Sequence, residues 1–284
     1  MGKRLLYARS AQWAALAERI DQLMAGPFFR PLKNQGRTAA GFLEGPGAAR
    51  AFVKRVSVES WLSRLAYAVR PSRAARALRG AALLAGAGFS ASRPLAALEV
   101  RRRGLLRESY WLAEPLTGAR VLSRVALDGQ LELAARRRLL ELVAREVRSL
   151  HDRGLYSCDL QETNLLVESD ARGAFRLHFV DLEDFRAAAT VGQRRRLLNL
   201  AHLDCTIGRF LNRGARLRFL YAYLGTRPPR ARRRRLLRQL ERIRLRVQKR
   251  AGWRRLRRLL KGALGRLGPA SLPAGALKAK RSQP

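Results

Sequence analysis

Apolar residues recur at helical spacing along much of the chain. The first such stretch runs from Leu5 to Met24 and predicts an amphipathic helix, whose apolar positions are Leu5, Trp13, Leu16, Ile20 and Leu23. Further helices are predicted over Arg73 to Ala85, Leu131 to Leu150, Arg194 to Leu224 and Arg230 to Leu267. The second half of the chain is therefore expected to be mostly helical.

Three short apolar runs predict strands instead. They are Ala51 to Val56, Tyr110 to Leu116 and Leu177 to Leu182. Glycines and prolines punctuate the sequence from the end of the first helix to Gly47, which suits turns and short strands. Strands with one helix thus come first and a mostly helical half follows. This order favours a two-lobed α+β fold over a doubly wound sheet, in which strands and helices would alternate more regularly.

Length and composition narrow the class of protein. The chain has 284 residues, 47% of them hydrophobic, which suffices for one large domain or two modest ones. No apolar run approaches the roughly 20 residues that a membrane-spanning helix needs. The first residues are too polar for a secretion signal, so we expect a cytoplasmic protein. The two cysteines, Cys158 and Cys205, have no metal-ligand spacing, and a reducing compartment disfavours a disulfide.

The charge is strongly positive. The chain has 59 Lys and Arg against 21 Asp and Glu, a formal net charge of +38. Such a chain attracts polyanions, which could be nucleic acid, an anionic membrane face or a phosphorylated substrate. Arginine greatly outnumbers lysine, and alanine and leucine are abundant, so part of this excess reflects a compositional bias. Charge alone therefore names no partner.

The most informative segment is His151 to Val167, which ends a predicted helix and leads into a strand. Asp159 and Asn164 lie five positions apart, the Asp-x-x-x-x-Asn spacing of a kinase catalytic loop. In such a loop the Asp accepts a proton from the attacking hydroxyl and the Asn binds magnesium. Asp181 ends the next apolar strand, where it can hold the metal that bridges the phosphates of ATP. The alternative is that these residues are loop caps and solvated acids.

These residues resemble the lipopolysaccharide kinase family, a branch of the protein-kinase-like superfamily that covers the heptose and 3-deoxy-D-manno-octulosonic acid (Kdo) kinases of the bacterial inner core. The resemblance rests mainly on His151 to Arg186 and on the strand Ala51 to Val56. Softer patterns lie at Ala87 to Phe89, Arg93 to Ala96, Glu114 to Leu116 and Arg216 to Leu224. The likeness covers roughly residues 30 to 225.

The resemblance gives further residues expected roles in binding ATP. It implies that Lys54 contacts the α- and β-phosphates of the nucleotide and that the backbone from Glu114 to Leu116 forms the hinge that reads adenine. Composition supports Lys54 independently, because no other lysine lies between Lys33 and Lys249 in a stretch crowded with arginine. The alternative is a surface lysine on an edge strand.

Several features depart from the kinase pattern. Kinases pair the strand lysine with a glutamate on the following helix, but residues 60 to 98 contain no acidic residue, and Glu59 precedes that helix. Gly41, Gly45 and Gly47 do not spell a regular glycine-rich loop. Ser157 and Cys158 stand where many protein kinases have His-Arg before the catalytic Asp, which suggests no control by activation-loop phosphorylation. These departures keep a non-catalytic pseudokinase as an alternative.

Two basic segments lie outside this pattern. Arg101, Arg102 and Arg103 are expected in a hairpin turn, as a solvated patch or a contact for substrate phosphate. The stretch from Arg230 to Leu267 interleaves leucines and Trp253 with arginines, which suits either an anionic membrane surface or a docking face for the rest of the protein. Nucleic-acid binding is disfavoured, because aromatic residues are only 7% of the chain and no nucleic-acid-binding motif is present.

The sequence thus predicts an ATP- and Mg²⁺-dependent kinase with a two-lobed protein-kinase-like α+β fold. Its expected parts are an N-terminal amphipathic helix (1–29), an N-terminal lobe (30–115), a catalytic lobe (116–225), a basic helical extension (226–267) and a disordered tail (268–284). By resemblance, the acceptor is a heptose or Kdo hydroxyl of the lipopolysaccharide inner core, and the enzyme lies peripherally on the inner face of the cytoplasmic membrane. The alternatives are a kinase for a soluble molecule or a protein, and a pseudokinase scaffold.

Overall fold

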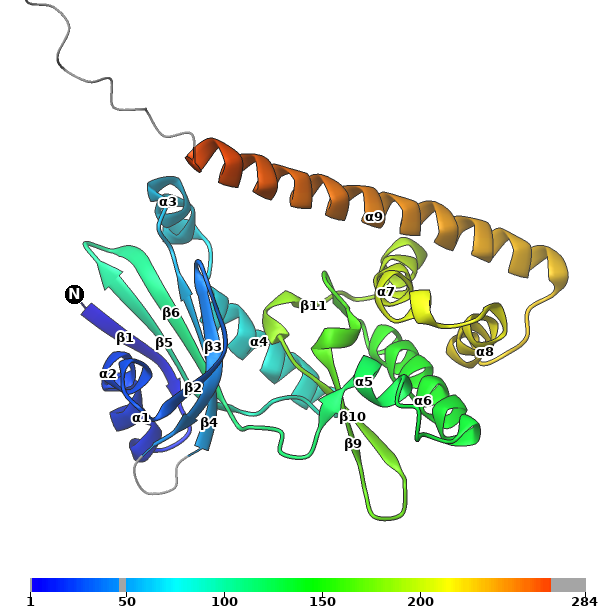
Figure 1. Cartoon of the computed structure of the whole chain (residues 1–284), viewed down its shortest axis with the longest axis horizontal. Coiled ribbons are helices and arrows are strands. Elements are labelled where there is room, and N and C mark those ends of the chain that lie inside the picture. Colours follow the sequence, from blue (N-terminus) through cyan, green and yellow to red (C-terminus); the bar gives the residue numbers. More distant parts are fainter. Residues whose placement is uncertain (1, 46–49, 267–284) are drawn as a thin grey trace, which may run out of the picture.

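The computed structural model describes the backbone of residues 2–45 and 50–266, with side chains except those of 35, 251 and 254–266. It has the two-lobed α+β architecture that the sequence predicts (Figure 1). The strands are β1 (Gly2–Ala8), β2 (Phe29–Gln35), β3 (Thr38–Glu44), β4 (Arg50–Ser57), β5 (Pro94–Arg102), β6 (Leu105–Ala113), β7 (Arg120–Val121), β8 (Leu155–Ser157), β9 (Leu165–Ser169), β10 (Phe175–Phe179) and β11 (Phe185–Ala187).

The helices gather in the second lobe, with four exceptions. The α-helices are α1 (Ala11–Glu18), α2 (Ile20–Ala25), α3 (Trp61–Val69), α4 (Arg73–Gly86), α5 (Leu122–Ala126), α6 (Leu133–Asp152), α7 (Gln193–Thr206), α8 (Arg213–Leu224) and α9 (Arg230–Arg266). Short 3-10 turns lie at η2 (Glu162–Asn164), η3 (Leu182–Asp184) and η4 (Gly208–Phe210).

The first lobe is built on a six-stranded antiparallel sheet with the strand order β1-β5-β6-β4-β3-β2. Strand side chains alternate between its two faces, as the pleat requires. Leu98, Tyr110 and Leu112 pack with α1 and α2 in one cluster, whereas Ala97 and Trp111 pack with α4 in the other. The sheet is therefore covered on one face by α1 and α2, and α4 lies between the other face and the second lobe.

The N-terminal segment differs from the sequence prediction. Gly2–Ala8 form strand β1, with Leu5 opposite Leu98 of β5, so a helix that begins at Leu5 is wrong. The helical part begins only at Ala11 and is interrupted at Arg19. The spacing of Leu5 suits a helix, but without β1 strand β5 would be an open edge of the sheet. Pairing with that edge satisfies the backbone hydrogen-bonding groups of residues 2–8 and outweighs the local helical pattern. The other predicted apolar positions do face the core, since Ile20 and Leu23 are buried and Trp13 and Leu16 pack against the same cluster.

A buried tyrosine connects β1 and α2 to the sheet. The Tyr110 hydroxyl lies within hydrogen-bonding distance of two carboxylates, that of Asp21 on α2 and, at 2.6 Å, that of Glu108. Burial and these two carboxylates raise the pKa of Tyr110 well above its ordinary value, so the hydroxyl stays a donor. Lys3 of β1 pairs with Asp21 at 2.8 Å. These contacts hold the N-terminal segment on the lobe.

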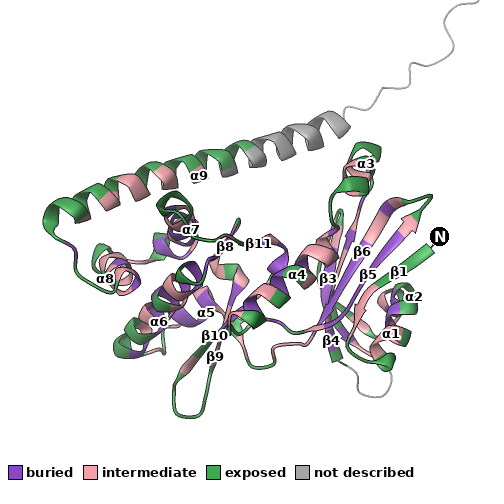
Figure 2. Cartoon of the chain, turned by 180° about the vertical axis from the view of Figure 1, so that it is seen from behind, coloured by how far each residue is buried: buried purple, intermediate pink, exposed green. Residues whose placement is uncertain are grey.

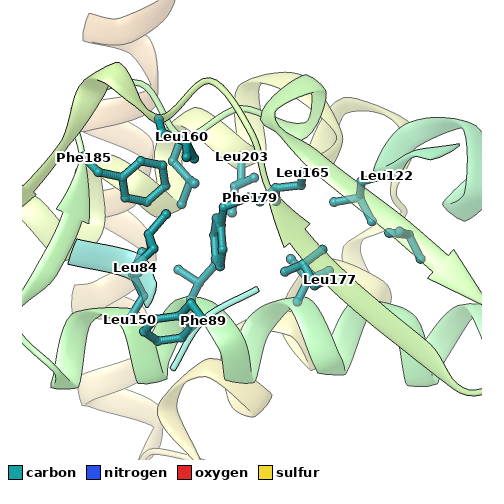
Figure 3. Packing of buried hydrophobic residues seen from close by; sticks show 14 of the residues in the cluster. Leu84, Phe89, Leu122, Leu150, Leu160, Leu165, Leu177, Phe179, Phe185 and Leu203 are labelled. Atoms are coloured by element: carbon teal, nitrogen blue, oxygen red, sulfur yellow. The ribbon is translucent and has the colours of Figure 1, made fainter. Parts of the chain in front are cut away.

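The core of the second lobe surrounds α6 and the β9–β10 hairpin. The α6 residues Leu139, Val143, Val147 and Leu150 are fully buried, which confirms the predicted apolar face. Phe179 lies edge-on to Phe89 and to Phe185, with ring centroids 5.8 and 5.5 Å apart (Figure 3). Phe89 follows α4, so this aromatic contact joins the two lobes close to the end of β10.

The last helices cover the second lobe. The helix predicted over Arg194 to Leu224 is divided into α7 and α8, because Asn212 caps α8 by accepting a hydrogen bond from the Ala215 N–H at 2.9 Å. Helix α9 crosses α7 and α8, and its Leu237, Leu240 and Ile243 pack against the core (Figures 1 and 2). No helix in the described ranges is long and apolar enough to cross a membrane. The predicted disordered tail, 268–284, lies outside the described residues.

Candidate active site

A cavity of about 420 Å³ lies between the lobes. Strands β2, β3, β4 and β6 of the first lobe and helix α4 line one side, and η2, β9 and the segment that follows β10 line the other. Five residues singled out from the sequence line this one cavity, namely Lys54, Glu114, Leu116, Asn164 and Asp181. Residues up to 127 positions apart in the chain are thus brought together, as in the Lys54–Asp181 pair.

Lys54 enters the cavity because of its place on β4. Ala51 and Val53 are completely buried in the cluster with α1 and α2, so Phe52 and Lys54 face the opposite way, into the cavity. The Lys54 ammonium lies 2.7 Å from Asp181 Oδ1 and 3.4 Å from Glu183 Oε1. The surface-lysine alternative is therefore not the arrangement observed, since the Lys54 side chain is only 19% exposed.

Glu183 is the functional candidate that sequence reasoning missed. Its side chain is 6% exposed and lies 2.8 Å from Arg73 Nη1 and 3.7 Å from Arg76 Nη2, besides Lys54. Glu59, the acidic residue before α3, instead pairs with Arg37 at 3.3 Å. The carboxylate that reaches the strand lysine thus comes from the segment after Asp181, and the helix supplies arginines.

The start of α4 is a favourable place for the Glu183 carboxylate. Arg73 is the first residue of α4, where the helix dipole disfavours a cation and favours an anion. Burial lowers the pKa of Arg73, but the Glu183 carboxylate and Tyr67 outweigh this effect and raise its pKa above the ordinary value. The signal available in the sequence was a pair of arginines one turn apart at the start of a helix that has no acid, combined with an acid two residues after Asp181.

Backbone contact fixes the position of the segment that carries Asp181 and Glu183. A Cβ added at Gly80 of α4 would lie 2.0 Å from the Leu182 carbonyl oxygen, so only glycine allows α4 to approach this closely. Asp181 itself adopts φ 56° and ψ 58°, a left-handed conformation that is uncommon outside glycine but tolerated by Asp. A strained backbone at such a place is typical of functional loops.

Asp159 lies beside the cavity and not among its lining residues. The Asn164 Nδ2 donates to the Asp159 carbonyl at 3.0 Å, which connects the two ends of the Asp-x-x-x-x-Asn segment. Gln161 Nε2 donates to Asp159 Oδ1 at 2.6 Å, and His202 Nδ1 lies 3.8 Å from the same oxygen. The Asp159 side chain is 48% exposed, so a large acceptor can reach it.

A buried polar network holds the strand that leads to Asp159. His151 Nδ1 lies 2.9 Å from the Tyr223 hydroxyl and Nε2 lies 3.0 Å from Asn199 Oδ1. Asn199 donates to the Ser157 carbonyl at 2.5 Å and accepts from the Ser157 N–H at 3.3 Å. His151 thus has a packing and hydrogen-bonding role, and its network connects α6, α7 and α8 to the strand before Asp159.

The segment from Glu114 to Leu116 crosses from the first lobe to the second along the cavity wall. The Glu114 N–H donates to the Arg93 carbonyl at 2.9 Å, and the Glu114 carboxylate pairs with Arg9. In the described ranges neither the Glu114 carbonyl nor the Leu116 N–H makes a backbone hydrogen bond. The Glu114 carbonyl, an acceptor, and the Leu116 N–H, a donor, thus have no backbone partner at this wall of the cavity.

Other predicted features lie away from the cavity. Of the three arginines expected in a hairpin turn, Arg101 and Arg102 end strand β5, and only Arg103 lies in the β5–β6 turn, where it and Gly104 have positive φ. Of the glycines that do not spell a regular glycine-rich loop, Gly41 lies on β3, where a Cβ would be 2.2 Å from the Arg30 carbonyl oxygen, and Gly47 lies outside the described residues. The β2–β3 turn contains Gly36 at φ 52°. No cluster of three metal-ligating side chains occurs among the described residues.

Comparisons with known proteins show the family and the fold of the chain. A family model described as the lipopolysaccharide kinase (Kdo/WaaP) family matches residues 49–223, more than half of the chain. A solved structure described as WaaP in complex with acyl carrier protein is similar with a TM-score of 0.63 and 21% identity, covering 86% of this chain and 98% of that chain. That structure supports the protein-kinase-like α+β fold. No curated protein matches the chain.

Proposed function

Because this chain belongs to the lipopolysaccharide kinase (Kdo/WaaP) family, we propose that it transfers the γ-phosphate of ATP to a sugar hydroxyl of the lipopolysaccharide inner core. The acceptor sugar is a heptose or Kdo, and the reaction takes place at the cytoplasmic face of the inner membrane. The observation that carries the proposal is the single cavity into which Lys54, Asn164 and Asp181 converge from two lobes. Phosphoryl transfer needs such a convergence of positive and metal-binding groups, because it depends mainly on positioning and charge neutralisation.

The donor set suits Mg²⁺. One carboxylate and one amide oxygen, completed by phosphate oxygens and water, is a usual magnesium environment in kinases. Asn164 uses its Nδ2 to bind the Asp159 carbonyl, which leaves its Oδ1 as a ligand, and Asp181 supplies the carboxylate. When bound there, the metal ion neutralises charge on the phosphates. Lys54, 2.7 Å from Asp181, adds a positive charge in the same place for the α- and β-phosphates.

Asp159 is proposed to orient the acceptor hydroxyl and accept its proton. The Gln161 hydrogen bond holds one carboxylate oxygen, and the exposed side chain faces an approaching sugar. The hinge backbone is proposed to read adenine, since the Glu114 carbonyl can accept a hydrogen bond and the Leu116 N–H can donate one. These roles place the nucleotide inside the cavity and the acceptor at its edge.

Glu183 is proposed to be a positioning residue for Lys54. It takes the part that a helix glutamate has in other kinases, and Arg73 and Arg76 hold it from α4. This arrangement speaks against the pseudokinase alternative, because the absence of an acid on α4 does not leave Lys54 without a carboxylate partner. It also holds Lys54 in place relative to Asp181, because Asp181 and Glu183, which both contact Lys54, belong to the same short segment.

The experiment that tests the proposal is transfer from γ-labelled ATP to purified inner-core lipopolysaccharide. We expect Asp159→Asn, which keeps size and shape, to lower the rate by at least about 100-fold because the general base is lost. The exposed control Glu132→Gln should keep the wild-type rate. If wild type transfers phosphate to a soluble sugar or to a protein but not to lipopolysaccharide, the proposed acceptor class is wrong. Absence of both transfer and ATP binding would contradict the kinase assignment.

A second proposal concerns a partner. The similar solved structure is of WaaP with acyl carrier protein, and we propose that this chain also binds an acyl carrier protein. An apolar cavity of about 480 Å³ between α6, α7, α8 and α9 supports it, because an acyl chain needs such a lining, here Leu140, Leu200, Leu203, Leu220, Leu237 and Leu240. Pull-down with acylated and unacylated carrier protein tests it. Binding that requires the acyl group is expected, and no binding of either form would reject the proposal.

A further inference from the structure

Helix α3 has its apolar side turned outward. Trp61, Leu62 and Val69 are 65%, 61% and 86% exposed, and Leu65 between them is 48% exposed. No residue of α3 is buried, as Figure 2 also shows. A helix that packs on a core hides its apolar stripe, so this orientation is the reverse of what folding alone would select.

The polar side of α3 is the one that faces the protein. Arg64 Nε donates to the Val58 carbonyl at 2.9 Å, which holds the helix on the lobe. Tyr67 lies close enough to Arg73 of α4 to raise the pKa of that guanidinium, together with Glu183 and against the effect of burial. These contacts fix the helix rotation, so the outward position of Trp61 and Leu65 is built into the fold.

Arginines surround the exposed apolar face. Arg70 follows α3 directly, and Arg64, Arg102 and Arg107 lie close together beside it. Burial, and then repulsion from Arg64 and Arg102, lowers the pKa of Arg107. An exposed tryptophan and leucines with an arginine border are the composition of helices that lie in the interface of an anionic membrane.

We propose that α3 docks the protein on an anionic lipid bilayer, with Trp61, Leu62, Leu65 and Val69 in the interface and the arginines against lipid phosphates. The inference deepens the proposed function and rests on it for the lipid-borne acceptor. Helix α3 connects β4, which carries Lys54, to α4, which carries Arg73, so docking would bring the cleft to the membrane. The arginine-rich α9 runs along the same edge of the molecule at which α3 lies, the upper edge in both views (Figures 1 and 2).

The test is sedimentation of the full chain with vesicles of phosphatidylcholine alone or mixed with phosphatidylglycerol. The variant Trp61→Ser, Leu65→Ser, Val69→Ser should lower affinity for the anionic vesicles by about tenfold or more, because the removed side chains would otherwise be buried in lipid. Its matched control is Leu127→Ser, Leu133→Ser, Phe210→Ser, which removes another exposed apolar cluster, on the second lobe, and should leave the affinity unchanged. Quenching of tryptophan fluorescence by brominated lipid gives an independent readout when wild type is compared with Trp61→Phe, because the chain has four tryptophans.

Each outcome decides the proposal. Loss of binding in the α3 variant but not in the control supports it, provided that ATP binding and thermal stability are unchanged. Equal binding by both variants and wild type, or binding lost only when arginines of α9 are replaced, overturns it. Self-association that the α3 variant abolishes, without vesicle binding, would make the face a dimer contact and also overturn it. Because vesicle binding needs no acceptor sugar, a failed kinase assay would leave this result readable.

Discussion

At the scale of single residues, the arrangement around Lys54 separates this chain from the usual kinase pattern. The partner carboxylate belongs to the segment that carries Asp181, and the helix contributes Arg73 and Arg76. Lys54, Asp181 and Glu183 are thereby coupled, since movement of one short segment would shift two contacts of the lysine at once. Replacing a residue that acts through this coupling should change the KM for ATP more than the free energy of unfolding.

We therefore predict that Glu183→Gln raises the KM for ATP and lowers kcat/KM by about 100-fold, because a displaced lysine misplaces the phosphates. Glu183→Asp should recover part of the loss, since it restores the charge. Glu59→Gln, which removes an exposed acid paired with Arg37, is the control and should behave as wild type. Steady-state kinetics on these variants, with thermal unfolding alongside, would refute the role if stability fell but the KM for ATP did not change.

At the scale of elements, the contact of α4 with the Leu182 backbone decides the geometry of the site. Gly80→Ala should lower activity because the new methyl group would lie 2.0 Å from the Leu182 carbonyl oxygen and push α4 from the segment of Asp181 and Glu183. Gly86→Ala, in the same helix with nothing within 4 Å, should instead stabilise the protein by up to about 1 kcal/mol. Urea unfolding and ATP binding measure both effects, and equal behaviour of the two variants would contradict the packing argument.

The network that joins α6, α7 and α8 gives a pH dependence. Burial lowers the pKa of His151 below 6.5, although the Asn199 hydrogen bond opposes this. The unfolded chain therefore takes up the proton first as pH falls, so the stability that neutral His151 provides is complete above about pH 6.5 and is lost towards the lower folded pKa. Melting temperatures between pH 7.5 and 5 should fall more steeply for wild type than for His151→Gln. Parallel curves would show that another group titrates.

At the scale of the whole molecule, the sequence predicted what local patterns encode and missed what distant contacts decide. The Asp159–Asn164 spacing, together with the family resemblance that singled out Lys54, predicted a shared site, and Lys54, Asn164 and Asp181 do line one cavity. Strand β1 was missed because its pairing with β5 is a tertiary choice. The Glu183 contact was missed for the same reason, since it depends on how closely α4 approaches a segment about 100 residues later.

Helix α9 is predicted to stabilise the second lobe. Leu237, Leu240 and Ile243 pack against the core, and Arg244 lies 3.8 Å from Asp204, which also pairs with Arg216. Deleting residues 230–284 should therefore cost about 3 kcal/mol or more of unfolding free energy, because the apolar surface under α9 is exposed. Deleting only residues 251–284 keeps these contacts and should leave stability and ATP binding unchanged. Urea titration of both truncations checks this, and equal stability would mean that α9 does not support the catalytic lobe. Only the shorter deletion is a clean test of whether the basic end of the chain takes part in transfer to a lipid-borne acceptor.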